Sequence, residues 1–188
     1  MIDKQAEILK AALRLFVENG FHGTPTSLIA KEAGVANGTL FHYFSTKEDL
    51  IVSLYVAIKK NLSSCITIHP DATATLKDKL KHIYVMALKW GIDNTTEFRF
   101  VQQFISSPYL LKLAPEEIQQ KNNMILLLFQ QGIDEHIIKP ISVDLINTLV
   151  NSHLFGVSQY ILQSLFSEAE QDKVIYDSYE LVWDMIAE

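Results

Sequence analysis

The sequence predicts an all-α protein in which a small N-terminal three-helix unit precedes a larger helical domain. Apolar residues recur at helical spacing along most of the 188 residues, and only 7 Gly and 5 Pro interrupt this spacing. No pair of alternating apolar and polar segments indicates neighbouring strands. Hydrophobic residues make up 48% and charged residues 20% of the chain, so it can bury a core and is not expected to be disordered.

The first three helices are expected at residues 4–18, 25–32 and 37–44. In the first helix, Ile8 and Leu15 lie on one apolar face, and the pair Asn19–Gly20 ends it. Thr24 is the predicted N-cap of the second helix, and Pro25 suits its first position, where the missing N–H costs nothing. A turn with the sequence GVANG then leads into a third helix of only two turns.

The remaining helices have comparable start and stop signals. Thr46 and Asp49 form a capping pair that opens a fourth helix at residues 47–64. Further apolar periodicity predicts helices at residues 75–92, 97–106, 115–131, 142–166 and 168–187. We therefore expect an N-terminal domain at residues 1–46, a connecting fourth helix, and a C-terminal domain within residues 47–188.

A helix, a tight glycine-containing turn and a second short helix, braced by the first helix, form the layout of a helix-turn-helix. In such a unit the second helix of the pair enters the major groove of DNA. Leu40 and Phe44 are four residues apart and are expected to point into the core. The outer face then carries Asn37, Gly38, Thr39, Phe41, His42 and Tyr43. Asn can pair with adenine, Thr can contact a base edge or a thymine methyl, and a Tyr hydroxyl can hold a phosphate.

Residues 8–50, which include AALRLFVENGFHGTPTSLIAKEAGVANGTLFHYFSTKEDL, resemble the N-terminal domain of the TetR family of bacterial transcriptional repressors. The rest of the chain resembles that family only in length, helical content and order of elements. The sequence departs from the family pattern at two positions. Ala36 stands where the family has Ser, which removes a capping hydroxyl and leaves Asn37 as the alternative cap. Phe41 stands where the family has Tyr, which removes one phosphate hydrogen bond.

The resemblance implies a set of DNA contacts at matching positions. Thr24, Thr26 and Ser27 would meet the sugar-phosphate backbone at the start of the second helix. Thr39 and His42 would read base edges, and Tyr43 and Lys47 would bind phosphate. The alternative for Phe41 and Tyr43 is that they fill a domain interface. The full predicted set is Thr24, Thr26, Ser27, Asn37, Gly38, Thr39, Phe41, His42, Tyr43 and Lys47.

The charge distribution is unusual for a DNA-binding protein. The formal net charge is −6, and residues 141–188 hold eight acids against the single base Lys173. Residues 1–50 contain five bases and six acids, so the predicted DNA-binding domain is nearly neutral. A basic surface, which would favour DNA binding, is therefore missing from the sequence pattern.

The resemblance also implies an effector pocket in the C-terminal domain, mostly apolar with a few polar anchors. The residues assigned to it are Tyr84, Met86, Trp90, Phe100, Gln103, Phe104, Asn123, Phe129 and His153. The alternative is that these residues form an ordinary aromatic core. Few charged residues fall on the inward faces, which predicts a small apolar effector.

The last two expected helices are broadly apolar, and Gly156 lies in the middle of the first of them. Together with the resemblance, this predicts a four-helix bundle with a second copy of the chain. The predicted interface consists of Leu149, His153, Gly156, Val157, Tyr160, Val174, Ser178, Leu181 and Met185. The alternative is that both helices close the core of a monomer.

Several classes of function are not indicated by the sequence. We find no metal-ligand spacing, no nucleophile–base pair, no catalytic residues, no cofactor motif and no membrane-length apolar run. A single cysteine, Cys65, and no signal-peptide pattern fit the cytoplasm. We expect a homodimeric repressor on a pseudo-palindromic double-stranded operator, released by a small hydrophobic effector. The alternative is a dimeric, architectural DNA-binding protein without an effector.

Overall fold

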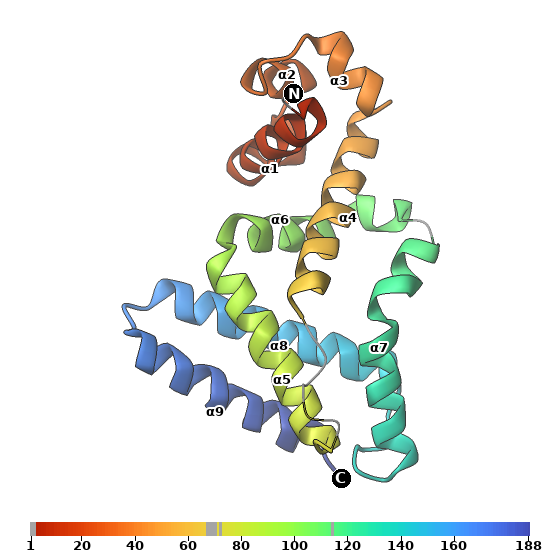
Figure 1. Cartoon of the computed structure of the whole chain (residues 1–188), viewed down its shortest axis with the longest axis vertical. Helices are drawn as coiled ribbons and strands as arrows, with labels where there is room; N and C mark the ends of the chain where they lie inside the picture. Colours follow the sequence, from red (N-terminus) through yellow and green to blue (C-terminus); the bar gives the residue numbers. More distant parts are fainter. Residues whose placement is uncertain (1–2, 67–70, 72, 114) are drawn as a thin grey trace. The chain divides into compact units, whose positions relative to one another are not determined.

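The computed structural model describes residues 3–66, 71, 73–113 and 115–188, without the side chains of residues 115–123. The prediction of an all-α fold is confirmed: in these ranges no strand occurs beyond one isolated bridge between Ile138 and Ala187. The helices are α1 (Lys4–Gly23), α2 (Thr26–Glu32), α3 (Asn37–Tyr43), α4 (Lys47–Cys65), α5 (Leu76–Asp93), α6 (Thr95–Ile105), the 3₁₀ turn η1 (Pro108–Lys112), α7 (Pro115–Asp134), α8 (Val143–Gln163) and α9 (Glu168–Ile186) (Figure 1).

The chain forms two compact units whose boundary differs from the predicted one. Unit 1 consists of Met1–Asn61 and Asn94–Glu117, and unit 2 of Leu62–Asp93 and Ile118–Glu188. The predicted N-terminal domain ended at residue 46, but most of α4, all of α6 and η1 belong to the same unit as α1, α2 and α3.

Aromatic packing explains why α6 and η1 belong to unit 1. The ring of Phe21 lies edge-on to Phe100 at 5.6 Å and to Tyr109 at 5.4 Å. Phe104 stacks on Tyr55 of α4 with 4.0 Å between ring centroids. Such pairs are worth about 0.5–1.5 kcal/mol each beyond the apolar area they bury. Unit 1 therefore combines α1, α2, α3 and most of α4 with a segment from the middle of the chain, α6 and η1 (Figure 1).

The first helix continues past its predicted end. The structure has Gly20 at φ 72° and ψ 167°, outside the helical region, so the helix kinks there. Only glycine adopts this conformation readily. Residues 21–23 then form one more helical turn, which brings the buried Phe21 into the aromatic cluster. The predicted glycine signal was correct, but it marks a kink and not the end of the helix.

The starts of α2 and α3 also differ from the prediction. The N-cap of α2 is Pro25 and not Thr24, and the N-cap of α3 is Ala36. Neither helix start has a side-chain cap, whereas Asp3, Ser142 and Ser167 cap α1, α8 and α9. The alternative that Asn37 caps the third helix is therefore wrong. The predicted cap of α4 is confirmed, because the Asp49 amide donates to Thr46 Oγ1 at 3.0 Å.

Unit 2 is built on three mutually packed helices, α5, α8 and α9, of which α8 and α9 form an antiparallel pair (Figure 1). Buried residues of these helices, including Leu88, Ile146 and Tyr179, form one core with Phe129 of α7 and Ile138. On the surface, Glu180 of α9 binds Lys77 at 2.6 Å and Lys81 at 2.8 Å, which ties α9 to α5.

Two helical glycines should respond in opposite ways to alanine. A methyl group at Gly132 would lie 2.5 Å from Ile138 Cδ1 and 2.8 Å from Leu76 Cδ2, both in the core. We expect Gly132→Ala to destabilise the protein by about 1–3 kcal/mol. Nothing lies within 4 Å of the same position at Gly156, so Gly156→Ala should stabilise it by up to about 1 kcal/mol. Urea unfolding of both variants tests this, and equal signs would contradict it.

Candidate nucleic-acid interface

Two buried residues anchor the short helix α3. Leu40 is 0% exposed and Phe44, its C-cap residue, is 3% exposed, as the spacing predicted. Phe41 and Tyr43, between these anchors, are each 41% exposed. Because α3 contacts both α1 and α2, the two anchors fix its orientation and leave its other side chains outward.

The structure brings most of the predicted contact residues to the surface. Ser27, Asn37, Gly38 and His42 are exposed, and Thr26, Thr39 and Lys47 are partly exposed. The rings of His42 and Tyr43 lie edge to face, with 5.5 Å between their centroids. The outward face of α3 therefore combines an amide, a hydroxyl, an imidazole and two aromatic rings, and it carries no Lys, Arg, Asp or Glu.

Thr24 does not belong to the contact set. Its side chain is 0% exposed, and its hydroxyl lies 2.8 Å from the carbonyl oxygen of Gly20 and 3.1 Å from that of Leu15. The prediction that Thr24 contacts the DNA backbone is therefore wrong in this structure. Nothing in the local sequence pattern reveals that the hydroxyl of Thr24 turns inward.

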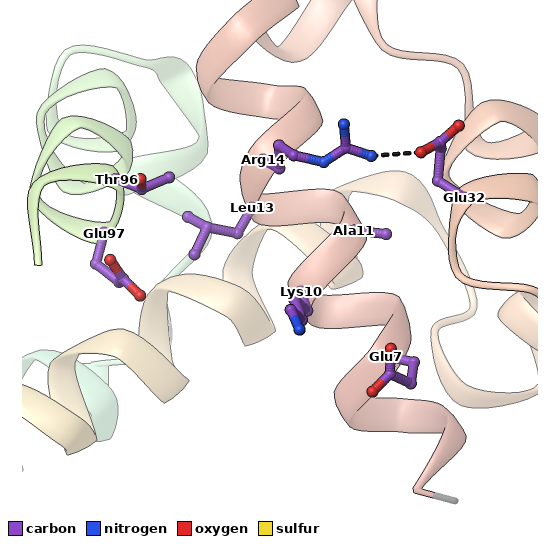
Figure 2. A pocket seen from close by; sticks show the side chains of 8 residues that line it. All are labelled: Glu7, Lys10, Ala11, Leu13, Arg14, Glu32, Thr96 and Glu97. Atoms are coloured by element: carbon purple, nitrogen blue, oxygen red, sulfur yellow. Dashed lines mark hydrogen bonds and ion pairs between the residues drawn. The ribbon is translucent and has the colours of Figure 1, made fainter.

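Positive charge near α3 is scarce. Lys47 begins α4, where partial burial lowers the pKa of its amine and neighbouring Glu48 partly offsets this. Arg14 of α1 forms an ion pair with Glu32 of α2 at the protein surface (Figure 2). This pair borders a cavity of about 450 Å³ whose lining also includes Lys10, Glu7 and Glu97, so the charges there have mixed signs (Figure 2).

The predicted effector residues lie in two different units. Phe100 and Phe104 are fully buried in the aromatic core of unit 1, and Gln103 donates to the carbonyl oxygen of Val17 at 3.4 Å. Tyr84, Met86, Trp90, Phe129 and His153 belong to unit 2. The side chain of Asn123 lies outside the described residues. The nine residues thus do not form one cluster within either unit. The cause is that core and pocket residues share the same helical spacing.

In unit 2, the predicted effector residues Tyr84 and His153 form a polar network with Ser178, which was predicted for the dimer interface. The Tyr84 hydroxyl lies 2.9 Å from His153 Nδ1 and 3.0 Å from Ser178 Oγ, and Ser178 Oγ donates to the Ile175 carbonyl at 2.8 Å. Burial raises the pKa of Tyr84 to about 12, and burial also lowers the pKa of His153. The network links α5, α8 and α9, and it satisfies polar groups that would be costly to bury alone.

The predicted dimer residues divide into an exposed and an inward group. Leu149, Tyr160, Leu181 and Met185 are 36%, 56%, 66% and 38% exposed, and Gly156 faces open space. Val157 and Val174 pack against the core of unit 2. Ser178 is only 5% exposed and bound to Tyr84, so its assignment to an interface is wrong. The exposed apolar surface also includes Leu145, Leu162 and Tyr176, which the sequence pattern did not single out.

The structure also bears on other kinds of site. Among the residues it describes, no group of three His, Cys, Asp or Glu side chains could hold a metal ion. Within the same residues, no helix is long and apolar enough to span a membrane.

The arrangement of α1, α2 and α3, with the outward face of α3, is that of a helix-turn-helix unit. The family model of the bacterial regulatory proteins of the tetR family matches residues 8–54. A TetR family transcription regulator from Shewanella sp. PV-4 has a TM-score of 0.91 to this chain, with 29% identity and full coverage of both chains. The chain therefore belongs to the TetR family of DNA-binding transcription regulators, as the sequence predicted.

Two further relatives are named for what they regulate or bind. The fatty acid metabolism regulator protein of Bacillus subtilis is 32% identical over 128 residues, which cover 65% of this chain and 60% of that protein. FadR from Bacillus subtilis, solved in complex with stearoyl-CoA, has a TM-score of 0.74 at 22% identity and covers 96% of each chain, which shows the fold alone.

Proposed function

We propose that this chain is a repressor that binds a pseudo-palindromic operator as a homodimer and leaves it when a fatty-acyl effector binds. The observation that carries the proposal is the helix α3, whose buried Leu40 and Phe44 leave an outward face of Asn37, Thr39 and His42. These side chains match the hydrogen-bonding groups of base edges in the major groove. The proposed contact set is the predicted one without Thr24.

The lack of charged residues on the exposed face of α3 favours contacts to bases over contacts to phosphates. A face without charges makes hydrogen bonds and apolar contacts to bases but few ion pairs with phosphate. Affinity should therefore depend weakly on salt, because counterion release scales with the number of phosphates that cations neutralise. Lys47 is the cation that we assign to phosphate. This also accounts for DNA binding by a protein with a net charge of −6.

Pairing of two chains would give the twofold symmetry that a palindrome requires. The exposed Leu149 and Tyr160 of α8 and the exposed Leu181 and Met185 of α9 supply apolar surface for such a bundle. The recognition helices would then meet successive major grooves about 34–36 Å apart. We place this activity in the cytoplasm and assign the protein no enzymatic role.

The effector class rests on relatives. The fatty acid metabolism regulator and the stearoyl-CoA complex of FadR point to long acyl chains. A relative named KstR2, 24% identical over 147 residues covering 76% of this chain and 74% of that protein, is described as a ketosteroid regulator, which makes a steroid the second candidate. An architectural protein without an effector is the remaining alternative.

DNA contacts can be tested with operators selected from a random duplex library by the wild-type protein. Tyr43→Phe and Lys47→Ala should weaken binding to all selected sites, and Lys47→Ala should make the salt slope shallower by about 1 per chain from a wild-type value of about −2 per dimer. Thr39→Ala and His42→Ala should each remove about 1–3 kcal/mol of discrimination at defined base positions. Lys173→Ala, on exposed α9 surface, is the control. Failure to enrich any duplex at physiological salt would overturn the proposal.

The dimer can be tested by placing a charge on the exposed apolar surface. Leu181→Glu and Leu149→Glu should yield monomers and weaken operator binding at least tenfold, because an unpaired charge would be buried between helices. Leu111→Glu is the matched control, since Leu111 is 89% exposed and lies in η1 of unit 1. Sedimentation velocity measures the outcome. Variants that stay dimeric at micromolar concentration would refute this interface.

The effector can be tested with stearoyl-CoA, free stearate, coenzyme A alone and a ketosteroid. Stearoyl-CoA at micromolar concentration should raise the thermal midpoint of unfolding, because it binds the folded protein. It should also release labelled operator in an anisotropy assay, because a ligand shifts the conformational equilibrium toward the state that it binds more tightly. Coenzyme A alone should do neither. If no member of the panel changes the midpoint or the affinity, the architectural alternative is the better account.

A further inference from the structure

The kink of α1 at Gly20 leaves carbonyl groups that side chains from outside the helix satisfy. A residue at φ 72° interrupts the i to i+4 ladder of backbone hydrogen bonds. The carbonyl of Val17 accepts from Gln103 of α6, and the carbonyl of Gly20 accepts from the Thr24 hydroxyl at 2.8 Å. That hydroxyl is also 3.1 Å from the Leu15 carbonyl oxygen, so its single proton is shared between a carbonyl before the kink and the carbonyl of the kink residue.

The chain between the kink and α2 is held at both ends. Phe21, directly after the kink, is 8% exposed and lies against Phe16, Phe100 and Tyr109. Thr24 is 0% exposed, and the next residue, Pro25, is the N-cap of α2 without a side-chain cap of its own. The position at which α2 begins is therefore set by the bonds of Thr24 and not by a cap on α2.

We propose that Thr24 is a positioning residue for DNA recognition, whose hydroxyl locks the Gly20 kink and thereby fixes α2 and, through it, α3. This inference rests on the proposed DNA-binding function. α2 contacts both α1 and α3, so a shift in where α2 begins is passed on to the helix that carries Thr39 and His42. Thr24 acts through the backbone of α1 and does not touch DNA.

The hydrogen bonds of the Thr24 hydroxyl should increase the fraction of molecules in which α3 is positioned to bind the operator. When the binding-competent state is only a fraction of the molecules, the apparent affinity falls by that fraction. Specific recognition needs α3 in one register, whereas non-specific binding depends on phosphate charge and tolerates displacement. Loss of the lock should therefore weaken operator binding more than binding to random DNA. Partial unfolding would weaken both equally.

The test compares Thr24→Val, which keeps the shape and removes the hydroxyl, with Thr24→Ser, which keeps the hydroxyl. We expect Thr24→Val to weaken operator binding about fivefold, as for loss of one hydrogen bond, with little change on random duplex. Thr24→Ser should restore most of the specificity. Thr96→Val is the matched control, because Thr96 is exposed on α6 of the same unit, lies outside the proposed DNA contact set and should not alter the kink. Gly20→Ala strains the backbone at the kink itself, because alanine rarely adopts the positive φ of Gly20. It should therefore reproduce the Thr24→Val pattern even if Thr24→Val folds poorly.

Hydrogen exchange on the protein without DNA gives a second measurement. Amides in the last turn of α1 and the first turn of α2 should exchange faster in Thr24→Val and Gly20→Ala, and at the wild-type rate in Thr24→Ser and Thr96→Val. Unchanged exchange in both joint variants, or equal loss of operator and random-duplex binding, overturns the role of Thr24. If the wild-type protein selects no operator, the proposed function fails, and the exchange data still decide whether the lock exists.

Discussion

Burial of Leu40 and Phe44 is the constraint on which the recognition surface depends. α3 is one of the shortest helices described, and a helix of two turns is not stable alone. Its conformation must come from the contacts of these two residues with the helices beneath. Because both anchors lie on one side, the other residues of α3, at positions 37–39 and 41–43, remain exposed or partly exposed. The spacing that buries Leu40 and Phe44 therefore determines which residues of α3 are available to contact DNA.

The surface charge of the protein agrees with this separation between buried anchor residues and exposed contact residues. In many DNA-binding domains a basic surface supplies affinity and a few polar groups supply specificity. In this protein Arg14 forms an ion pair with Glu32, and α3 contains no Lys, Arg, Asp or Glu. Under the proposed function, most of the free energy of specific binding would come from hydrogen bonds and apolar contacts at base edges, with Lys47 as the phosphate contact. Such contacts are lost at a wrong sequence, so weak general affinity and high discrimination arise from the same composition.

The sequence predicted the all-α class, the helix-turn-helix and the outward residues of α3, because helical spacing and glycine positions depend on local physics. It could not predict the hydrogen-bond partners of Thr24, because the same hydroxyl can cap α2 or bond to the carbonyls of the kinked α1. It also could not separate Phe100 and Phe104 from Tyr84. All three sit on inward helix faces, and periodicity does not tell which of two cores a face joins. Three-dimensional contacts, such as those of Phe100 with Phe21 and of Phe104 with Tyr55, assign α6 to unit 1.

That assignment constrains any mechanism by which an effector controls DNA binding. The segment of α6 and η1 belongs to unit 1, yet the chain joins unit 2 at both of its ends, before Asn94 and after Glu117. Within unit 1 the segment contacts α1 through Phe100 and through Gln103, which bonds to the carbonyl just before the Gly20 kink. A ligand changes DNA affinity only if it binds two arrangements of the protein unequally. Under the proposed function, those two arrangements must differ in what they impose on this segment, because its contacts lead from the covalent links with unit 2 to the joint where α2 begins.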